Sequence, residues 1–151
     1  MSGLSQAMCT SFKVELLTGT HNFTLTTGNV FKVALFKANA SIVGTYGAAT
    51  TNYSDMTGNS DETSGTAYVA GGNTLTNVTP VASGTTAIVD FADTTWSAAT
   101  ITTRGAIIYN STNANRAVAI LDFGSDKTST AGDFSIIWPT PDATNAIIRI
   151  S

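Results

Sequence analysis

The segment Thr100–Phe123 constrains the fold of this 151-residue chain more than any other part of its sequence. It contains two apolar, β-rich runs, Gly105–Tyr109 and Ala117–Phe123, separated by the polar residues Asn110–Arg116. Serine, threonine and asparagine between two such runs are typical of a hairpin loop, because their side chains bond their own backbone. Both runs are too continuously apolar for a strand with one wet face. The segment therefore predicts a central antiparallel pair that is covered on both sides.

Other short apolar stretches, bounded by turn residues, predict further strands. They are Val30–Lys37, Thr66–Ala70, Leu75–Val81, Thr86–Phe91, Phe134–Trp138 and Ala146–Ile150, with a short strand at Ser41–Tyr46 also considered. Gly124–Gly132 is expected to be a polar loop, and Trp96 is expected to close one end of the core. Evenly spaced short strands favour an all-β, antiparallel β-sandwich that is jelly-roll-like, with seven to nine strands and one N-terminal α-helix.

The chain length suits a single domain, residues 1–151, with the main strands in residues 65–151. Residues 2–18 are the one helix candidate, because apolar residues recur there every four positions and Gly19 follows at a typical C-terminal cap position. The recurring residues are Leu4, Met8, Phe12 and Leu16. Such a helix packs either on its own sandwich or on a partner.

Residues 38–64 form a long segment of Ala, Thr, Asn, Ser, Gly and Asp without a helical period. Loops of this length in compact domains are usually functional or are ordered by a partner, so this segment is the predicted interaction loop. Two arginines that flank the central hairpin are interpreted as ion-pair partners of nearby aspartates, with an interface, where arginine is enriched, as their expected location. The candidate interface residues are Leu4, Met8, Phe12, Tyr46, Tyr53, Asp55, Asp61, Glu62, Arg104 and Arg116.

Low charge is the unusual feature of the composition. Charged residues make up 11% of the chain, the formal net charge is -3, and there are 27 threonines. Because soluble domains usually carry about 25% charged residues, much of this surface is expected to be covered by neighbouring subunits. The seven Lys and Arg are scattered along the chain, which argues against nucleic acid as a partner. No run has the length of a membrane helix and no signal peptide is seen, so synthesis in a cytoplasm is expected.

Catalytic and metal-binding patterns are weak. Cys9 is the single cysteine, which excludes an intramolecular disulfide, and a buried, inert thiol is expected. His21 is the single histidine and is interpreted as a surface or capping residue. Five carboxylates near strand ends are interpreted chiefly as turn residues, with a cation site or a glycosidase-type pair as alternatives. They are Asp90, Asp93, Asp122, Asp126 and Asp133. The sequence thus predicts a protein without enzymatic activity, cofactor or metal.

Three segments resemble a family of small bacteriophage virion proteins. They contain MCTSFKVELLTGTHNF, ETSGTAYVAGGNTLTNVTP, and VDFADTTWSAATITTRGAIIYN continuing into NRAVAILDFGSDKTSTAGDF. The resemblance implies a non-enzymatic structural protein, such as a capsid decoration (cement) protein or part of a head or tail fibre. It implies residence in the phage particle after assembly in the bacterial cytoplasm. The expected partners are the major capsid protein and further copies of this chain, as a homotrimer, with neither nucleic acid nor membrane.

A fibre or receptor-binding module for host-surface glycans is the alternative. Aromatic side chains stack on pyranose rings, and Tyr46, Tyr53, Tyr68 and Trp138 are the candidates, although Trp96 and Trp138 are better explained as core residues. A glycan hydrolase that uses the carboxylates is the third class.

Overall fold

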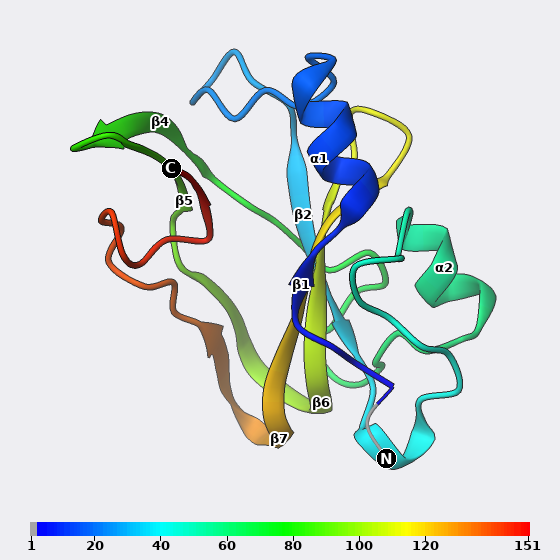
Figure 1. Cartoon of the computed structure of the whole chain (residues 1–151). Helices are drawn as coiled ribbons and strands as arrows, with labels where there is room; N and C mark the ends of the chain where they lie inside the picture. The colour runs from blue at the N-terminus through cyan, green and yellow to red at the C-terminus, as the bar shows by residue number, and fades with distance from the viewer. Residues whose placement is uncertain (1–2) are drawn as a thin grey trace.

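Two antiparallel sheets form the framework of the protein in the computed structural model, which describes residues 3–151 (Figure 1). The strands are β1 (Ala7–Met8), β2 (Phe31–Phe36), β3 (Asn73–Thr74), β4 (Asn77–Ser83), β5 (Thr86–Phe91), β6 (Thr94–Asn110), β7 (Arg116–Ile136) and β8 (Ile148–Ile150). The helices are α1 (Thr10–Leu17), α2 (Tyr53–Gly58) and a 3-10 turn, η1 (Asn39–Ser41). The larger sheet has the order β1-β7-β6-β2-β3, and the smaller has the order β4-β5-β8. The predicted all-β, antiparallel, sandwich-like fold is confirmed.

The central hairpin is formed by β6 and β7. Asn110 pairs with Arg116 beside the turn, and Ile107 pairs with Ile120 further down the ladder. Every residue of β6 from 105 to 110 is buried, as are residues 117–120 of β7. The predicted central pair and its connecting loop are therefore confirmed.

Both faces of the larger sheet are covered, as the continuous apolar runs require. Phe31 of β2 lies in an aromatic cluster with Phe23 and with Phe91 of β5, which joins the two sheets. Successive strand residues point to opposite faces, and Tyr109 lies beside Lys32, so Tyr109 belongs to the other face. There Tyr109 stacks on Tyr53 of α2 with ring centroids 4.5 Å apart. Figure 1 shows α2 and the smaller sheet on opposite sides of the central strands.

The central strands are longer than predicted. Residues 124–132 were expected to form a loop, but they lie within β7 and pair with the first half of β6. Thr102 and Thr128 face each other in this ladder and their hydroxyls are 3.0 Å apart. Threonine suits a pleated surface that is wet on one side, so polar composition does not exclude a strand here. Register shifts and the positive φ of Ala131 and Gly124 bend this part of β7.

The N-terminal helix is shorter than predicted. It begins at Thr10, whereas residues 7–8 form β1 and pair with Ile120 and Ala119 of β7. A four-residue spacing is compatible with both the helix period and the strand period of two, so Leu4 and Met8 did not distinguish them. The predicted first residue, Ser2, lies outside the described residues. The predicted cap at Gly19 is confirmed, since its φ is +76° and its N–H bonds to Leu16.

Two further strand predictions are wrong. Residues 41–46 contain part of η1 and an irregular segment, and residues 66–70 form turns in which Ala67 has a φ of +64°. By contrast, the predicted β5 has the observed bounds, and the predictions for β2 and β8 overlap the observed strands. Local composition therefore located the strands that carry large apolar side chains and misassigned the small polar stretches.

Candidate functional site

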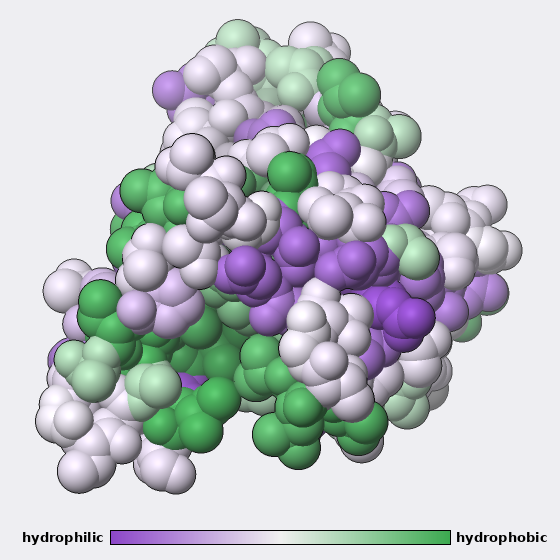
Figure 2. Space-filling model, turned by 90° about the horizontal axis from the view of Figure 1, so that it is seen from above, coloured by the Kyte–Doolittle hydropathy of each residue, from purple (hydrophilic) through white to green (hydrophobic). Residues whose placement is uncertain are grey.

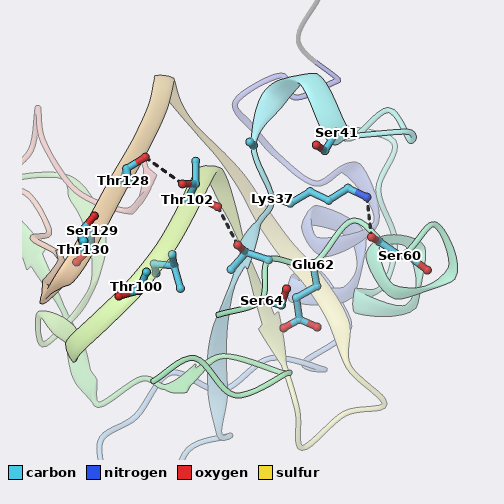
Figure 3. A pocket seen from close by; sticks show the side chains of 13 residues that line it. Lys37, Ser41, Ser60, Glu62, Ser64, Thr100, Thr102, Thr128, Ser129 and Thr130 are labelled. Carbon is cyan, nitrogen blue, oxygen red and sulfur yellow. Dashed lines mark hydrogen bonds between the residues drawn. The ribbon is translucent and has the colours of Figure 1, made fainter. Parts of the chain in front are cut away.

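A polar pocket of about 480 Å³ lies between the lower half of the β6–β7 ladder and the two ends of the 38–64 segment (Figure 3). Nine of its thirteen lining residues carry a hydroxyl group: Ser41, Ser60, Thr63, Ser64, Thr100, Thr102, Thr128, Ser129 and Thr130. Lys37 and Glu62 supply the charged groups of the lining. Hydroxyl groups both donate and accept hydrogen bonds, so this wall matches a neutral ligand rich in hydroxyls.

Internal hydrogen bonds hold the wall of this pocket in place. The Thr63 hydroxyl donates to the carbonyl of Thr102 at 2.8 Å, and the Ser129 hydroxyl donates to the carbonyl of Ala99 at 2.9 Å. Lys37 Nζ donates to the Ser60 carbonyl at 2.8 Å and lies 3.1 Å from Asp61 Oδ1. The pocket is thus largely preformed, with its cation already paired.

Asp61 is a fully buried carboxylate whose hydrogen bonds connect the two ends of the 38–64 segment. It accepts hydrogen bonds from the backbone N–H groups of Val43 and Gly44 and from the Tyr46 hydroxyl, at 3.0, 2.7 and 2.6 Å. Burial alone would raise the pKa of Asp61. The hydrogen bonds from Tyr46, Gly44, Val43 and Lys37 outweigh burial and hold this pKa below its ordinary value. Asp61 therefore stays ionised as a structural anchor.

Glu62, the next residue, accepts hydrogen bonds from two tyrosine hydroxyls and from one backbone N–H group. Its Oε2 accepts from Tyr53 at 2.5 Å, and its Oε1 accepts from Tyr68 at 2.7 Å and from the Gly71 N–H at 2.6 Å. Burial, together with the Glu62 carboxylate, raises the pKa of Tyr53 and Tyr68 above the ordinary tyrosine value. These phenols remain protonated donors at neutral pH, so the cluster supports structure rather than proton transfer.

The predicted interface residues do not form one surface. The structure corrects the prediction for Leu4, Phe12, Tyr46 and Asp61, which are buried in the chain's own core and are not available to a partner. Met8, Tyr53, Asp55 and Glu62 are half-buried, and Asp55 caps α2 by accepting from the Asn52 N–H. Arg104 pairs with Asp122 at 2.9 Å, and Arg116 pairs with Glu15 at 2.8 Å. The 38–64 segment is ordered by its own chain.

His21 is the residue that the sequence interpretation missed. It is 6% exposed, not on the surface, and its ring lies 4.9 Å from that of Phe12. Its Nε2 is 2.8 Å from Glu15 Oε2, and its Nδ1 is 2.9 Å from Asn110 Nδ2. Glu15 lies on a different element, α1, and Asn110 is distant from His21 in the sequence. No local sequence pattern therefore indicated this cluster.

Four of the five carboxylates near strand ends each bind a different partner, and Asp90 Oδ1 is buried without a hydrogen-bond partner among the described residues. Asp122 binds Arg104, Asp126 accepts from the Asn39 N–H, Asp133 accepts from the Ala98 N–H, and Asp93 accepts from the Trp138 N–H. No group of three or more His, Cys, Asp or Glu within residues 3–151 is placed to hold a metal ion. Cys9 is buried as expected, and burial, with the charges of Asp55 and Glu15, raises its pKa to about 12.

An apolar groove of about 440 Å³ follows the distal part of β7. It is lined by Phe123, Lys127, Phe134, Ser135, Ile136 and Ile137. The rings of Phe123 and Phe134 lie 6.3 Å apart, and Ile137 is 69% exposed. Seen from above, the molecule gathers apolar surface toward the side of the smaller sheet, beside a hydrophilic band (Figure 2). Apolar surface of this kind marks sites that bind other molecules.

Comparisons with protein-family models, curated proteins and solved structures find no match to this chain. None of the helices within residues 3–151 has the length and apolar character that crossing a membrane requires.

Proposed function

We propose that this chain is a non-enzymatic structural protein of a bacteriophage particle, a decoration protein that stabilises the capsid by contacts across capsomers. The observation that carries the proposal is the apolar groove beside β7 in a chain with 11% charged residues. Ten large apolar side chains are also exposed among the described residues: Val14, Leu17, Leu25, Val30, Val43, Val69, Val78, Val81, Ile137 and Ile150. The resemblance to small phage virion proteins supports the same conclusion.

The physical basis is burial of area against the particle. Each apolar square ångström that is covered contributes about 25 cal/mol, so opening the shell must expose this area again. Closed symmetry multiplies the effect, because a trimer presents the same groove three times to a symmetric surface. Low charge favours this arrangement, since few charged groups must be stripped of water when subunits meet.

The test is the copy number and position of this protein on purified particles, measured by quantitative gel electrophoresis and electron microscopy. The proposal expects copies spaced regularly over the head at a fixed ratio to the major capsid protein. Copies confined to the tail or to a few fibres would overturn it. Ile137→Asp, which charges the groove, should reduce the number of copies retained, whereas Val69→Asp, on an exposed side chain outside the groove, should not.

A second candidate is the glycan-binding module, and the hydroxyl-lined pocket of Figure 3 favours it. None of the four aromatic candidates, Tyr46, Tyr53, Tyr68 and Trp138, lines this pocket. Tyr46 is buried, Tyr53 and Tyr68 bind Glu62, and Trp138 donates to the Ala92 carbonyl. Titration with neutral oligosaccharides, followed by amide NMR shifts, tests this candidate. Shifts confined to the pocket and weakened by Thr130→Val, but not by the exposed control Thr45→Val, would support it. Absence of shifts across the panel would remove it.

A further inference from the structure

His21 joins three elements that are distant in the sequence. It follows α1, its ring lies against Phe12 of α1 and 6.3 Å from Phe31 of β2, and it bonds to Asn110 at the end of β6. Its side chain is fully buried. Glu15 of α1 is the charged group that contacts the ring among the described residues, and Arg116 of β7 reaches the other oxygen of Glu15.

The orientation of the Asn110 amide is determined by its other hydrogen bonds. Its Oδ1 accepts from the backbone N–H groups of Thr112 and Asn113, at 3.1 and 3.2 Å. Its Nδ2 also donates to Asn29 Oδ1 at 2.9 Å. An amide nitrogen donates and does not accept, so Nδ2 must donate to the ring of His21. If the amide were reversed, its nitrogen would face the backbone N–H groups of Thr112 and Asn113, and its oxygen would face Asn29 Oδ1. Neither contact could form a hydrogen bond.

This orientation determines which tautomer the neutral ring adopts. Because Nδ1 accepts from Asn110, the ring carries its proton on Nε2, which donates to Glu15. A second proton, on Nδ1, would point directly at the Asn110 amide group. Two donors 2.9 Å apart in a buried site repel each other, and the ring N–H and the Asn110 N–H that faces it would both lack an acceptor.

The carboxylate of Glu15 has the opposite effect on the ring of His21, because it favours protonation. Burial would raise the pKa of Glu15, but hydrogen bonds from His21 and Arg116 outweigh burial and lower it. Glu15 is therefore ionised over the range in which histidine side chains take up a proton, and its charge favours a protonated ring. Asn110 thus favours the neutral ring, whereas Glu15 favours the protonated ring.

We propose that His21 is an acid-sensitive latch: protonation keeps its bond to Glu15 and breaks its bond to Asn110, which detaches the ring from the hairpin turn while Arg116 still holds Glu15. Other contacts between the turn, residues 111–115, and residues 19–30 do not involve the ring, since Asn113 Nδ2 bonds to the Thr20 carbonyl and to Asn29. The inference does not depend on the proposed function.

NMR of the full chain tests the latch. Long-range proton–nitrogen spectra at pH 8 should show the Nε2–H tautomer of His21. On acidification between about pH 8 and 5, the Asn110 side-chain amide signals should change together with the ring signals. The Nδ1–H tautomer at pH 8, or Asn110 signals that stay constant while the ring titrates, would overturn the proposal.

Asn110→Asp is the matched variant. Asp keeps an acceptor for Thr112 and Asn113 and replaces the donor that faces His21 with a second acceptor, and it also removes the donor to Asn29 Oδ1. The ring should then take up its second proton at a pH higher by about one unit or more, and the turn should stay attached to it. An unchanged midpoint would overturn the proposal. His21→Gln serves as the control, because it cannot titrate and should abolish the pH response of Asn110.

Discussion

The hydroxyl of Tyr46 donates a 2.6 Å hydrogen bond to the buried carboxylate of Asp61. Tyr46 also contacts Phe36 of β2, with ring centroids 4.6 Å apart, so the bond ties the 38–64 segment to the central sheet. A segment that the sequence predicts to be a long interaction loop is thereby held against the core of its own chain.

Asp61→Asn is expected to lower the free energy of unfolding by about 3 kcal/mol, because an amide nitrogen would face the N–H groups of Val43 or Gly44 and the charge-assisted bonds would be lost. Urea unfolding measures the change. Asp126→Asn is the control, since Asp126 is exposed and accepts one bond from Asn39. Equal effects of the two substitutions would contradict the anchoring role of Asp61.

Stability is expected to fall in acid. For Asp61, Glu15 and Asp122, hydrogen bonds and ion pairs outweigh burial and lower the folded-state pKa. A depressed folded-state pKa contributes stability above the unfolded value, about pH 4, and this stability is lost as pH falls further. Urea midpoints measured from pH 7 to pH 3 should therefore decrease below about pH 4, and less steeply in Asp61→Asn. An equal decrease in that variant would show that Asp61 does not contribute.

Gly72→Ala is expected to be more harmful than Gly84→Ala. Both glycines have a positive φ, +70° and +61°, so both substitutions carry the left-handed penalty of about 1–2 kcal/mol. A Cβ at Gly72 would also collide with the carbonyl oxygen of Val33 in β2, whereas nothing lies near a Cβ at Gly84. The difference between the two variants, expected to be at least about 2 kcal/mol in urea unfolding, isolates the cost of that collision.

Cys9 is expected to resist alkylation in the folded protein. Its side chain is fully buried, and burial is the main cause that raises its pKa to about 12, so thiolate is scarce at neutral pH. Mass spectrometry after iodoacetamide treatment should show unmodified protein, with complete modification in guanidinium. Rapid labelling without denaturant would mean that β1 opens locally, because Cys9 N–H bonds to Val118 beside it.

The candidate site could be predicted only in part. Sequence reasoning selected Asp61, Glu62 and Tyr53 as residues with a special role in the 38–64 segment, and they do form its main contacts. It assigned those contacts to a partner because composition does not reveal whether a polar side chain will find its hydrogen-bond partners within its own chain. The His21 cluster gave no signal, since Glu15 and Asn110 reach the ring only after α1 lies beside the hairpin.

The amino-acid sequence by itself determined the all-β fold class, the central hairpin and the bounds of β5, because large apolar side chains in short runs must be buried and turn residues end those runs. Tertiary structure alone decided that residues 124–132 form a strand and that the helix begins at Thr10. Small polar residues have weak local preferences, so pairing with β6 and β7 outweighs them. It also decided that Asp61 and His21 face inward, since a buried polar group is stable only where distant residues supply its hydrogen bonds.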